Sequence, residues 1–522
     1  MLRPGPEHEC LHASPSRRAA SGADDRGHIL TLVSPSRRPS PPVTIGLDIG
    51  TTSVKAIAVD EDGTVLARAR VPHALHTPTP GAFEHDIDRA WRADVLEALE
   101  QVSRGLDIAA VNVGAMIPSL GAVDGTGRAV GPGLLYGDHR GDRSPGTPAW
   151  EALRRASAGG DPAAEFGDWG ELVAFLRWHA RNTPGAAGFW PAQAVANHAL
   201  TGRAAIDSTT ATCALPLFNW TGWDADLAAE LGVSTAALPD IVPGVRPIGR
   251  VRDGLAGAGA PVGGGTIDAL GEQIVAGADE PGDVLVICGG TLITWAVAAQ
   301  EAAVPGLWTV PHTVPGTFLV GGPSNAGGLF IDHVTRWLGG DAGDAPAHLP
   351  DDLPIWLPYL RGERTPLQRP DLQASMHDAS LHHGAEHVRV AAFEATGFVV
   401  RRHLELAAPF GVRPRRIVAT GGGVRSRVWM QCLADVTGLP VDVVAVPEGA
   451  ALGSAFIARC SAGLESSLTD ARRWARTSHR VEPDATRRDG TDRRYRRFLA
   501  LSDAAVERLT DSPGIRSAGP PP

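Results

Sequence analysis

An aspartate and two threonines stand beside a glycine in the segment IGLDIGTTSVKAIAV, residues 45–59, between two apolar runs. The pattern predicts a β-hairpin whose tip carries Asp48, Thr51 and Thr52. Glycine lets a ligand approach the backbone N–H groups, and the two hydroxyls add donors for phosphate oxygens. A carboxylate would repel phosphate unless a divalent cation lay between them, so the tip favours a Mg²⁺–nucleotide site. An ordinary hairpin with an aspartate in its turn is the alternative.

Lys55 is the one lysine of the chain, because the other basic residues among the 48 are arginines. Its position just beyond the hairpin tip would place a compact positive charge beside the proposed phosphates. The alternative is chance, in a composition biased towards Gly, Ala and Arg.

A second acid, Asp268, follows three glycines in PVGGGTIDALGEQIVAGA, residues 261–278, at the expected start of a small-residue helix. The helix dipole stabilises a negative charge at that end, so we expect an ionised carboxylate at pH 7. Such a carboxylate could accept a proton from a substrate hydroxyl as a general base. The alternative is a structural acid at a helix N-terminus with no further role.

Two glycine turns, CGGT at 288–291 and TGGGVRS at 420–426, follow expected strands. Each could admit phosphate, ribose or adenine to the backbone, although neither has the spacing of a Walker A loop or a dinucleotide fingerprint. The chain contains no H-E-x-x-H and no G-x-S-x-G string, which leaves metalloprotease and serine-hydrolase chemistry without support. We interpret the densest histidine group, HDASLHHGAEH at 377–387, as a surface loop.

The elements that would position these residues form two similar sets. Between Val43 and Val71, apolar runs joined by short turns predict an antiparallel meander. The segment GDVLVICGGTLITWAV, residues 282–297, repeats the order of apolar run, Gly/Thr tip and apolar run, which indicates a duplicated unit. We therefore predict two related α/β domains, at about residues 43–278 and 279–480.

Composition and the two ends of the chain limit the class of protein. Hydrophobic residues make up 43% of the 522 residues, which fits a folded protein with two or more domains. Residues 1–42 are rich in Ser, Pro and Arg and lack the apolar core of a secretory signal, so we expect a disordered extension or a misassigned start. Residues 481–522 are expected to form a partly disordered tail with one helix.

Charge and cysteine usage limit the partners and the compartment. A net charge of −10 argues against nucleic acid and anionic membranes as partners. No apolar run reaches the roughly 18 residues that a membrane span needs. The five cysteines are widely spaced and form no CxxC pair, which indicates a reducing, cytoplasmic compartment.

Taken together, these segments resemble the FGGY family of carbohydrate kinases, and within it the xylulokinase-like members, over about residues 43–465. The segments that carry the resemblance occur in the family's order: GLDIGTTSVKA, PGAFEHDIDRAW, VGAMIPSLGAVDGTGR, GLLYGDHR, FLRWHARNTP, LTGRAAIDSTTAT, GGGTIDALGEQIVAGA, LPYLRGERTP and TGGGVRSRVWMQCLADVTGLPV. One such string could arise by chance, but so many in the right order should not. The resemblance implies an α/β fold of two actin-like (ribonuclease H-like) domains around a central cleft.

The resemblance also implies an enzyme that uses ATP to phosphorylate a terminal hydroxyl of a small ketose such as xylulose. Asp268 would be the general base and would contact the sugar, and Asp48 would hold Mg²⁺ through water. Glu84 and Met116 would also contact the sugar. Contacts with ATP are expected from Thr51, Thr52, Lys55, Gly290, Thr291, Gly327, Gly422, Gly423 and Ser426.

Two departures from the family pattern bear on these roles. Ile117 follows Met116 where the G-Q-M-H-G segment has a histidine, so a polar sugar contact is lost. Gly290 stands where the second phosphate motif has threonine, and Thr291 comes one place later. An actin-like ATPase and a sugar-binding kinase-fold protein without transfer activity are the alternatives. The sequence leaves the identity of the sugar and the oligomeric state open, a homodimer included.

Overall fold

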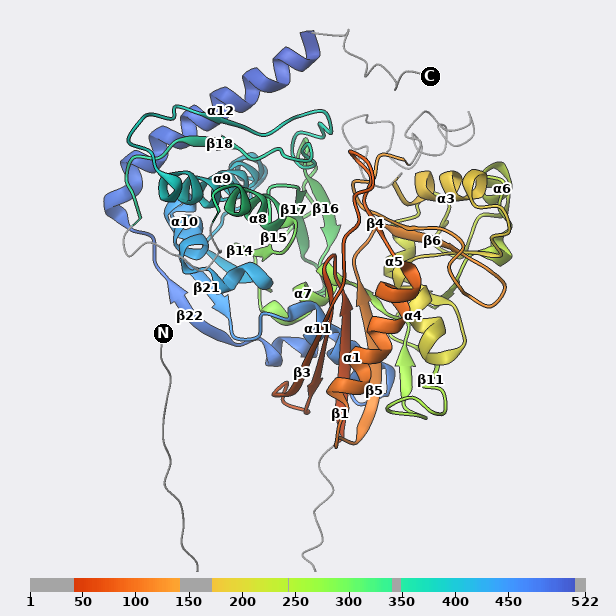
Figure 1. Ribbon diagram of the computed structural model, residues 1–522. Coiled ribbons are helices and arrows are strands. Elements are labelled where there is room, and N and C mark those ends of the chain that lie inside the picture. Colours follow the sequence, from red (N-terminus) through yellow and green to blue (C-terminus); the bar gives the residue numbers. More distant parts are fainter. Residues whose placement is uncertain (1–41, 141–170, 243, 340–348, 512–522) are drawn as a thin grey trace, which may run out of the picture. The chain divides into compact units, whose positions relative to one another are not determined.

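The computed structural model describes residues 42–140, 171–242, 244–339 and 349–511 (Figure 1). The expected N-terminal extension, residues 1–42, lies outside the described residues apart from its last position. Among the helices in these ranges, none combines the length and the apolar character that a membrane span requires.

A mixed β-sheet forms the core of the N-terminal half. In spatial order its strands are β11 (Pro247–Arg250), β12 (Pro261–Gly263), β5 (Ile108–Ala115), β1 (Val43–Ile49), β2 (Ser53–Val59) and β3 (Val65–Pro72), with β13 (Thr266–Ile267) also beside β5. Strands β1, β2 and β3 form the predicted antiparallel meander, and β5 pairs parallel with β1. Every residue of β1 is buried, as its nearly continuous apolar run predicts for a central strand.

Helices and a smaller sheet complete the N-terminal half. Helix α1 (Asp94–Val102), preceded by the π-helical turn η1 (Asp88–Ala93), packs on β2 and β3. The smaller sheet has the order β4 (Glu84–His85), β7 (Gly133–Leu135), β6 (Ser119–Val123) and β8 (Gly188–Trp190). The other elements are α3 (Glu171–Asn182), α4 (Ala192–Thr201), β9 (Ala205–Asp207), α5 (Ser208–Thr212), α6 (Ala225–Glu230), η3 (Thr235–Ala237) and β10 (Asp240–Val242).

The sheet of the C-terminal half repeats the arrangement of the first. In spatial order its strands are β16 (Trp308–Pro311), β17 (Phe318–Ser324), β15 (Leu292–Ala298), β14 (Asp283–Cys288), β20 (Arg416–Thr420), β21 (Val441–Val444) and β22 (Thr477–Val481). Strand β14 pairs antiparallel with β15 and parallel with β20, as β1 does with β2 and β5. This shared pattern confirms the duplication inferred from the two hairpin segments.

Helices pack against the C-terminal sheet. They are α8 (Gly328–Trp337), α9 (Ala385–Ala407), η4 (Ala408–Phe410), η5 (Gly422–Arg425) and α10 (Arg427–Thr437), and the short strands β18 (Ile355–Leu357) and β19 (Ser375–His377) pair beside them. Helix α10 begins after Ser426, whose Oγ accepts the Trp429 N–H at 3.2 Å. It ends at Gly438, whose positive φ of 67° suits glycine.

Helix α11 (Gly449–Ser461) belongs to the C-terminal half in sequence but packs on the N-terminal sheet. It contacts β1, β5 and α7 (Asp268–Ala276). A Cβ on Gly46 of β1 would lie only 1.8 Å from the carbonyl oxygen of Ala451, so glycine is needed for this close approach. Helix α11 therefore crosses the domain boundary that we placed between residues 278 and 279.

The C-terminal segment, which we expected to be a partly disordered tail with one helix, carries a long helix through Asp511. Helix α12 (Arg488–Asp511) follows the turns η6 (Leu468–Trp474) and η7 (Ala485–Arg487). Its Tyr495 and Phe498 are buried in the C-terminal core, on one helix face because they are three residues apart.

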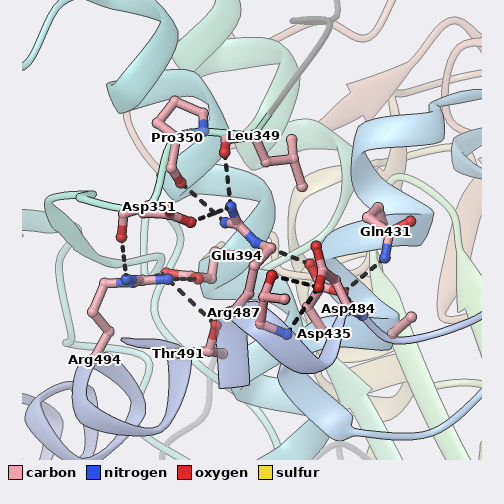
Figure 2. Close-up of polar contacts among 12 residues, drawn as sticks. Leu349, Pro350, Asp351, Glu394, Gln431, Asp435, Asp484, Arg487, Thr491 and Arg494 are labelled. Carbon is pink, nitrogen blue, oxygen red and sulfur yellow. Dashed lines mark hydrogen bonds and ion pairs between the residues drawn. The ribbon is translucent and has the colours of Figure 1, made fainter. Parts of the chain in front are cut away.

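Charged residues fasten α12 to the C-terminal core (Figure 2). Arg494 donates to both carboxylate oxygens of Glu394 on α9, at 2.7 and 2.6 Å. Arg487 Nε lies 3.1 Å from Asp435 Oδ2 on α10, and Arg487 Nη1 donates to the Leu349 carbonyl at 2.7 Å. Arg494 thus ties α12 to α9, and Arg487, the last residue of η7 just before α12, ties that turn to α10.

Arg494→Met should lower the free energy of unfolding by about 3 kcal/mol, because Glu394 would keep a buried charge without its partner. The Glu394 side chain is only 4% exposed. Arg496→Met is the matched control, since Arg496 is exposed on the same helix and should change stability by less than about 0.5 kcal/mol. Urea denaturation measures both variants. Equal losses would show that the ion pair does not anchor α12.

Candidate functional site

Asp48 and Lys55 lie opposite each other in the first hairpin. They are register partners on β1 and β2, and Lys55 Nζ lies 3.4 Å from Asp48 Oδ2. The Asp48 charge is the largest cause that raises the pKa of Lys55, against the opposing effect of burial. Asp48 Oδ1 is buried and has no hydrogen-bond partner within the described ranges. One carboxylate oxygen therefore remains for another ligand.

The tip of this hairpin presents donors to a ligand. Thr51 Oγ1 lies 2.8 Å from Tyr136 Oη, and Thr52 is exposed. For the part of the chain that the structure describes, no hydrogen bond from the backbone N–H of Thr51 or Thr52 is found. Two adjacent N–H groups in a turn are a typical anion-binding feature.

The second hairpin tip also approaches Tyr136. A Cβ on Gly290 would be 3.8 Å from Tyr136 Oη. Gly327 supports this tip, because a Cβ there would lie 2.4 Å from the carbonyl carbon of Thr291. The Gly328 N–H, at the start of α8, donates to the Gly289 carbonyl at 2.8 Å. The two predicted phosphate segments therefore meet around one hydroxyl group.

Asp268 is the first residue of α7, and its Oδ1 accepts the Ala269 N–H at 2.7 Å. Burial, followed by the nearby Asp48 carboxylate, raises the pKa of Asp268 to about 7, against the charges of Lys55 and Arg364. Our expectation of a fully ionised carboxylate at pH 7 was wrong, because desolvation outweighs the helix dipole. A pKa near 7 suits a general base that works at neutral pH.

Glu272 is an acidic neighbour that the sequence reasoning missed. It lies four residues after Asp268 and therefore on the same face of α7. Its Oε2 accepts the hydroxyl proton of Thr420, the last residue of β20, at 2.5 Å. Burial raises the pKa of Glu272 to about 7, while the Lys55 charge lowers it. The spacing of four from Asp268 was the available signal in the sequence.

The glycine turn after β20 has one packed side and one open side. A Cβ on Gly423 would lie 2.3 Å from the Trp429 ring and 2.8 Å from Cys288 Cβ. A Cβ on Gly422 would meet no described atom within 4 Å, so this residue borders open space. The Ser426 hydroxyl, expected to line the nucleotide pocket, caps α10.

The two additional residues expected to contact the sugar have protein partners. Glu84 Oε2 lies 2.7 Å from Arg140 Nη1, and the same guanidinium binds Asp138 at 2.7 Å. Met116 is 2% exposed within the apolar core of the N-terminal half, and its N–H donates to the Ile49 carbonyl at 3.1 Å. Their contact with a sugar stays a prediction.

Two arginines of the C-terminal half, Arg361 and Arg364, also lie against Tyr136. The sequence reasoning singled out neither of them. Arg361 Nη2 donates to the Tyr136 carbonyl at 3.1 Å, and its guanidinium stacks 4.2 Å from the centroid of Phe83. The guanidinium of Arg364 lies 5.8 Å from the Tyr136 ring centroid, and its charge lowers the pKa of Asp268. These contacts join motifs that are far apart in the sequence.

The histidine-rich segment, residues 377–387, runs from the end of β19 through a loop into the first turn of α9. Asp352, His382 and His383 bring one potential ligand atom each to within 4.8 Å of one another. However, His383 Nδ1 accepts the Ser380 N–H at 3.1 Å, so the neutral ring carries its proton on Nε2. This tautomer cannot bind a metal through Nε2, and we retain the interpretation of a surface loop.

Comparison with known proteins identifies the class to which this fold and site belong. The model of the N-terminal domain of the FGGY family of carbohydrate kinases matches residues 43–273, and that of the C-terminal domain matches residues 284–462. The chain belongs to the FGGY family. It is an ATP-dependent sugar kinase, a phosphotransferase with an alcohol group as acceptor, and the actin-like ATPase alternative is not favoured.

Relatives named for xylulose are similar over nearly the whole chain. A xylulose kinase of Streptomyces coelicolor is 29% identical over 503 residues, which cover 89% of this chain and 97% of that protein. An L-xylulose/3-keto-L-gulonate kinase of Escherichia coli is 26% identical over 88% of this chain and 96% of that protein.

Solved structures show the same two-domain fold. The xylulose kinase from Rhodospirillum rubrum superposes with a TM-score of 0.67 at 29% identity, and the match covers 88% of this chain and 98% of that chain. The Plasmodium falciparum glycerol kinase with ADP has a TM-score of 0.69 at 17% identity over 91% of this chain and 99% of that chain, and shares the fold.

Proposed function

We propose that this sugar kinase transfers the γ-phosphate of ATP, with Mg²⁺, to a terminal hydroxyl of a small ketose such as xylulose. The observation that carries the proposal is Asp268, whose pKa is raised to about 7 and which lies close enough to the Asp48–Lys55 pair for both charges to act on it. The names of the relatives support a ketose as substrate.

Asp48 fits a role in holding Mg²⁺. Its Oδ1 is buried and has no hydrogen-bond partner in the described parts of the chain, and carboxylate oxygen is the ligand type that Mg²⁺ prefers, often through water. When bound, the ion would neutralise charge on the phosphates of ATP. Lys55, paired with Asp48 Oδ2, would add a second positive charge on the same side.

In the proposed reaction, Asp268 takes the proton from the sugar hydroxyl while that oxygen forms a bond to the γ-phosphorus. The bond between the γ-phosphorus and ADP breaks, and ADP leaves with the electron pair. Thr51 and Thr52 hold phosphate oxygens through their N–H groups and hydroxyls, and Gly290 and Thr291 do so from the second hairpin. Positioning and charge neutralisation supply most of the rate in such transfers.

The remaining assignments place the two substrates on either side of the hairpins. Gly422, Gly423 and Ser426 are proposed to border the ribose and adenine, with Gly327 opposite. The open space at Gly422 supports this assignment. Glu84 and Met116 are proposed for the sugar side. The homodimer and the cytoplasmic location remain predictions of the sequence.

ADP release, measured with a panel of ketoses, aldoses, sugar acids and polyols, tests the proposed function. We expect sugar-dependent release, with ketopentoses giving the highest kcat/KM. Release that is equal with and without sugar would instead fit an actin-like ATPase. Sugar binding in calorimetry without ADP release would favour the protein that binds but does not transfer.

A further inference from the structure

Two histidines bind the carbonyl groups of the first hairpin tip. His73, just after β3, donates its backbone N–H to the Thr52 carbonyl at 3.0 Å and places its Nε2 3.0 Å from the Gly50 carbonyl. His85, in β4, places its Nε2 2.8 Å from the Thr51 carbonyl. Three consecutive carbonyls of the tip therefore bind groups that lie outside the hairpin.

The proton on the His85 ring is located by its two partners. The Trp91 indole N–H donates to His85 Nδ1 at 3.0 Å, so Nδ1 is an acceptor and Nε2 carries the proton. His85 Nε2–H therefore donates to the Thr51 carbonyl. Burial also lowers the pKa of His85 to about 4, which keeps the ring neutral at pH 7.

The His73 ring is oriented by an acid and an arginine. His73 Nδ1 lies 3.2 Å from Asp94 Oδ2, and Asp94 Oδ1 lies 2.6 Å from Arg89 Nε. Because the Gly50 carbonyl can only accept, His73 Nε2 carries a proton. The Asp94 carboxyl group is fully buried, and the His73 ring packs edge-on against His85 with centroids 4.6 Å apart. The two rings therefore form one rigid support.

We propose that His73 and His85 are positioning residues that aim the N–H groups of the tip at the phosphates of ATP. In a trans peptide the C=O and the next N–H point in opposite directions. Holding the Gly50 and Thr51 carbonyls on the histidine side therefore turns the N–H groups of Thr51 and Thr52 to the other side. A peptide rotated the other way would present a carbonyl oxygen, which repels phosphate. This inference rests on the proposed kinase function.

Without the hydrogen bond from His85 Nε2, the Thr51 carbonyl would no longer be held in one direction. In His85→Phe the ring shape is retained, but no N–H reaches the carbonyl, so the Thr51–Thr52 peptide can rotate. Losing one aimed N–H to a charged phosphate should weaken nucleotide binding by roughly 10–100-fold. His85→Gln is the matched variant, because its amide nitrogen can take the place of Nε2 and donate to Thr51.

Calorimetry with Mg²⁺ and a non-hydrolysable ATP analogue, and separately with D-xylulose, tests the inference. In His85→Phe we expect the Kd of the analogue to rise by roughly 10–100-fold while the Kd of the sugar changes by less than about twofold. His85→Gln should recover most of the nucleotide affinity. Wild-type affinity in His85→Phe, or an equal loss in both variants, would overturn the positioning role.

Two further measurements separate the positioning role from a folding defect and from a failure of the proposed function. If His85→Phe does not fold, His73→Phe and His73→Gln test the same support through the Gly50 carbonyl, with the same expected loss and recovery. A wild-type protein that binds the analogue but phosphorylates no sugar would refute the proposed function, while the comparison of variants would still decide the positioning role.

Discussion

Asp268→Asn should bind ATP and sugar with nearly wild-type affinity, yet its kcat should fall by about 10²–10⁴-fold. The asparagine keeps the size of the side chain but cannot accept the hydroxyl proton when the sugar oxygen attacks phosphorus. A coupled ADP assay measures kcat, and calorimetry measures both affinities. Asp253→Asn, at an exposed aspartate, is the control and should keep full activity. Turnover in Asp268→Asn close to the control would refute the assignment of the base.

The pH dependence gives the same prediction a second readout. The pKa of Asp268 is raised to about 7, and a base works only when it is deprotonated, so the wild-type kcat/KM should fall as the pH drops below about 7. The residual activity of Asp268→Asn should lack this decrease. Because folding disfavours the ionised form of Asp268, removing its charge should leave the melting temperature at pH 8 unchanged or higher. A lower melting temperature would indicate a structural role instead.

Asp48→Asn should raise the KM for ATP and lower kcat, because a neutral amide holds Mg²⁺ poorly. We expect kcat/KM for ATP to fall by about 10²–10⁴-fold. The loss should be largest at low Mg²⁺ concentration. The matched control is Asp60→Asn, since Asp60 only shapes the β2–β3 turn by accepting the N–H groups of Asp62 and Thr64. Unchanged ATP affinity of Asp48→Asn at low Mg²⁺ would limit Asp48 to a structural role as the strand partner of Lys55.

The parts of the site that lie within short segments could be predicted from the residue pattern of those segments alone. Apolar runs around Gly50 and around Gly290 predicted both hairpins, because strand and turn preferences act over a few neighbouring residues. The helix that begins at Asp268 followed from the same kind of pattern. The order of the motifs was enough to predict the family, which the comparisons confirm.

Packing between distant segments decided the rest. Helix α11 packs closely on β1, a contact between segments far apart in the chain that only the fold shows. The charges of α12 had no assigned role in the sequence reasoning. Arg494 of α12 finds its partner on α9, and Arg487 just before α12 finds one on α10, so this segment packs on the C-terminal core (Figure 2).

The sequence by itself determined which residues carry the acids, hydroxyls and glycines and which short elements hold them. The tertiary structure decided their chemistry. Thr51 meets Tyr136 across 85 positions, and Glu272 meets Thr420 across 148. The pKa of Asp268 depends on burial and on the charge of Asp48, which lies on another element. Burial and electrostatic interactions depend on distance in space, and distance along the chain does not predict them.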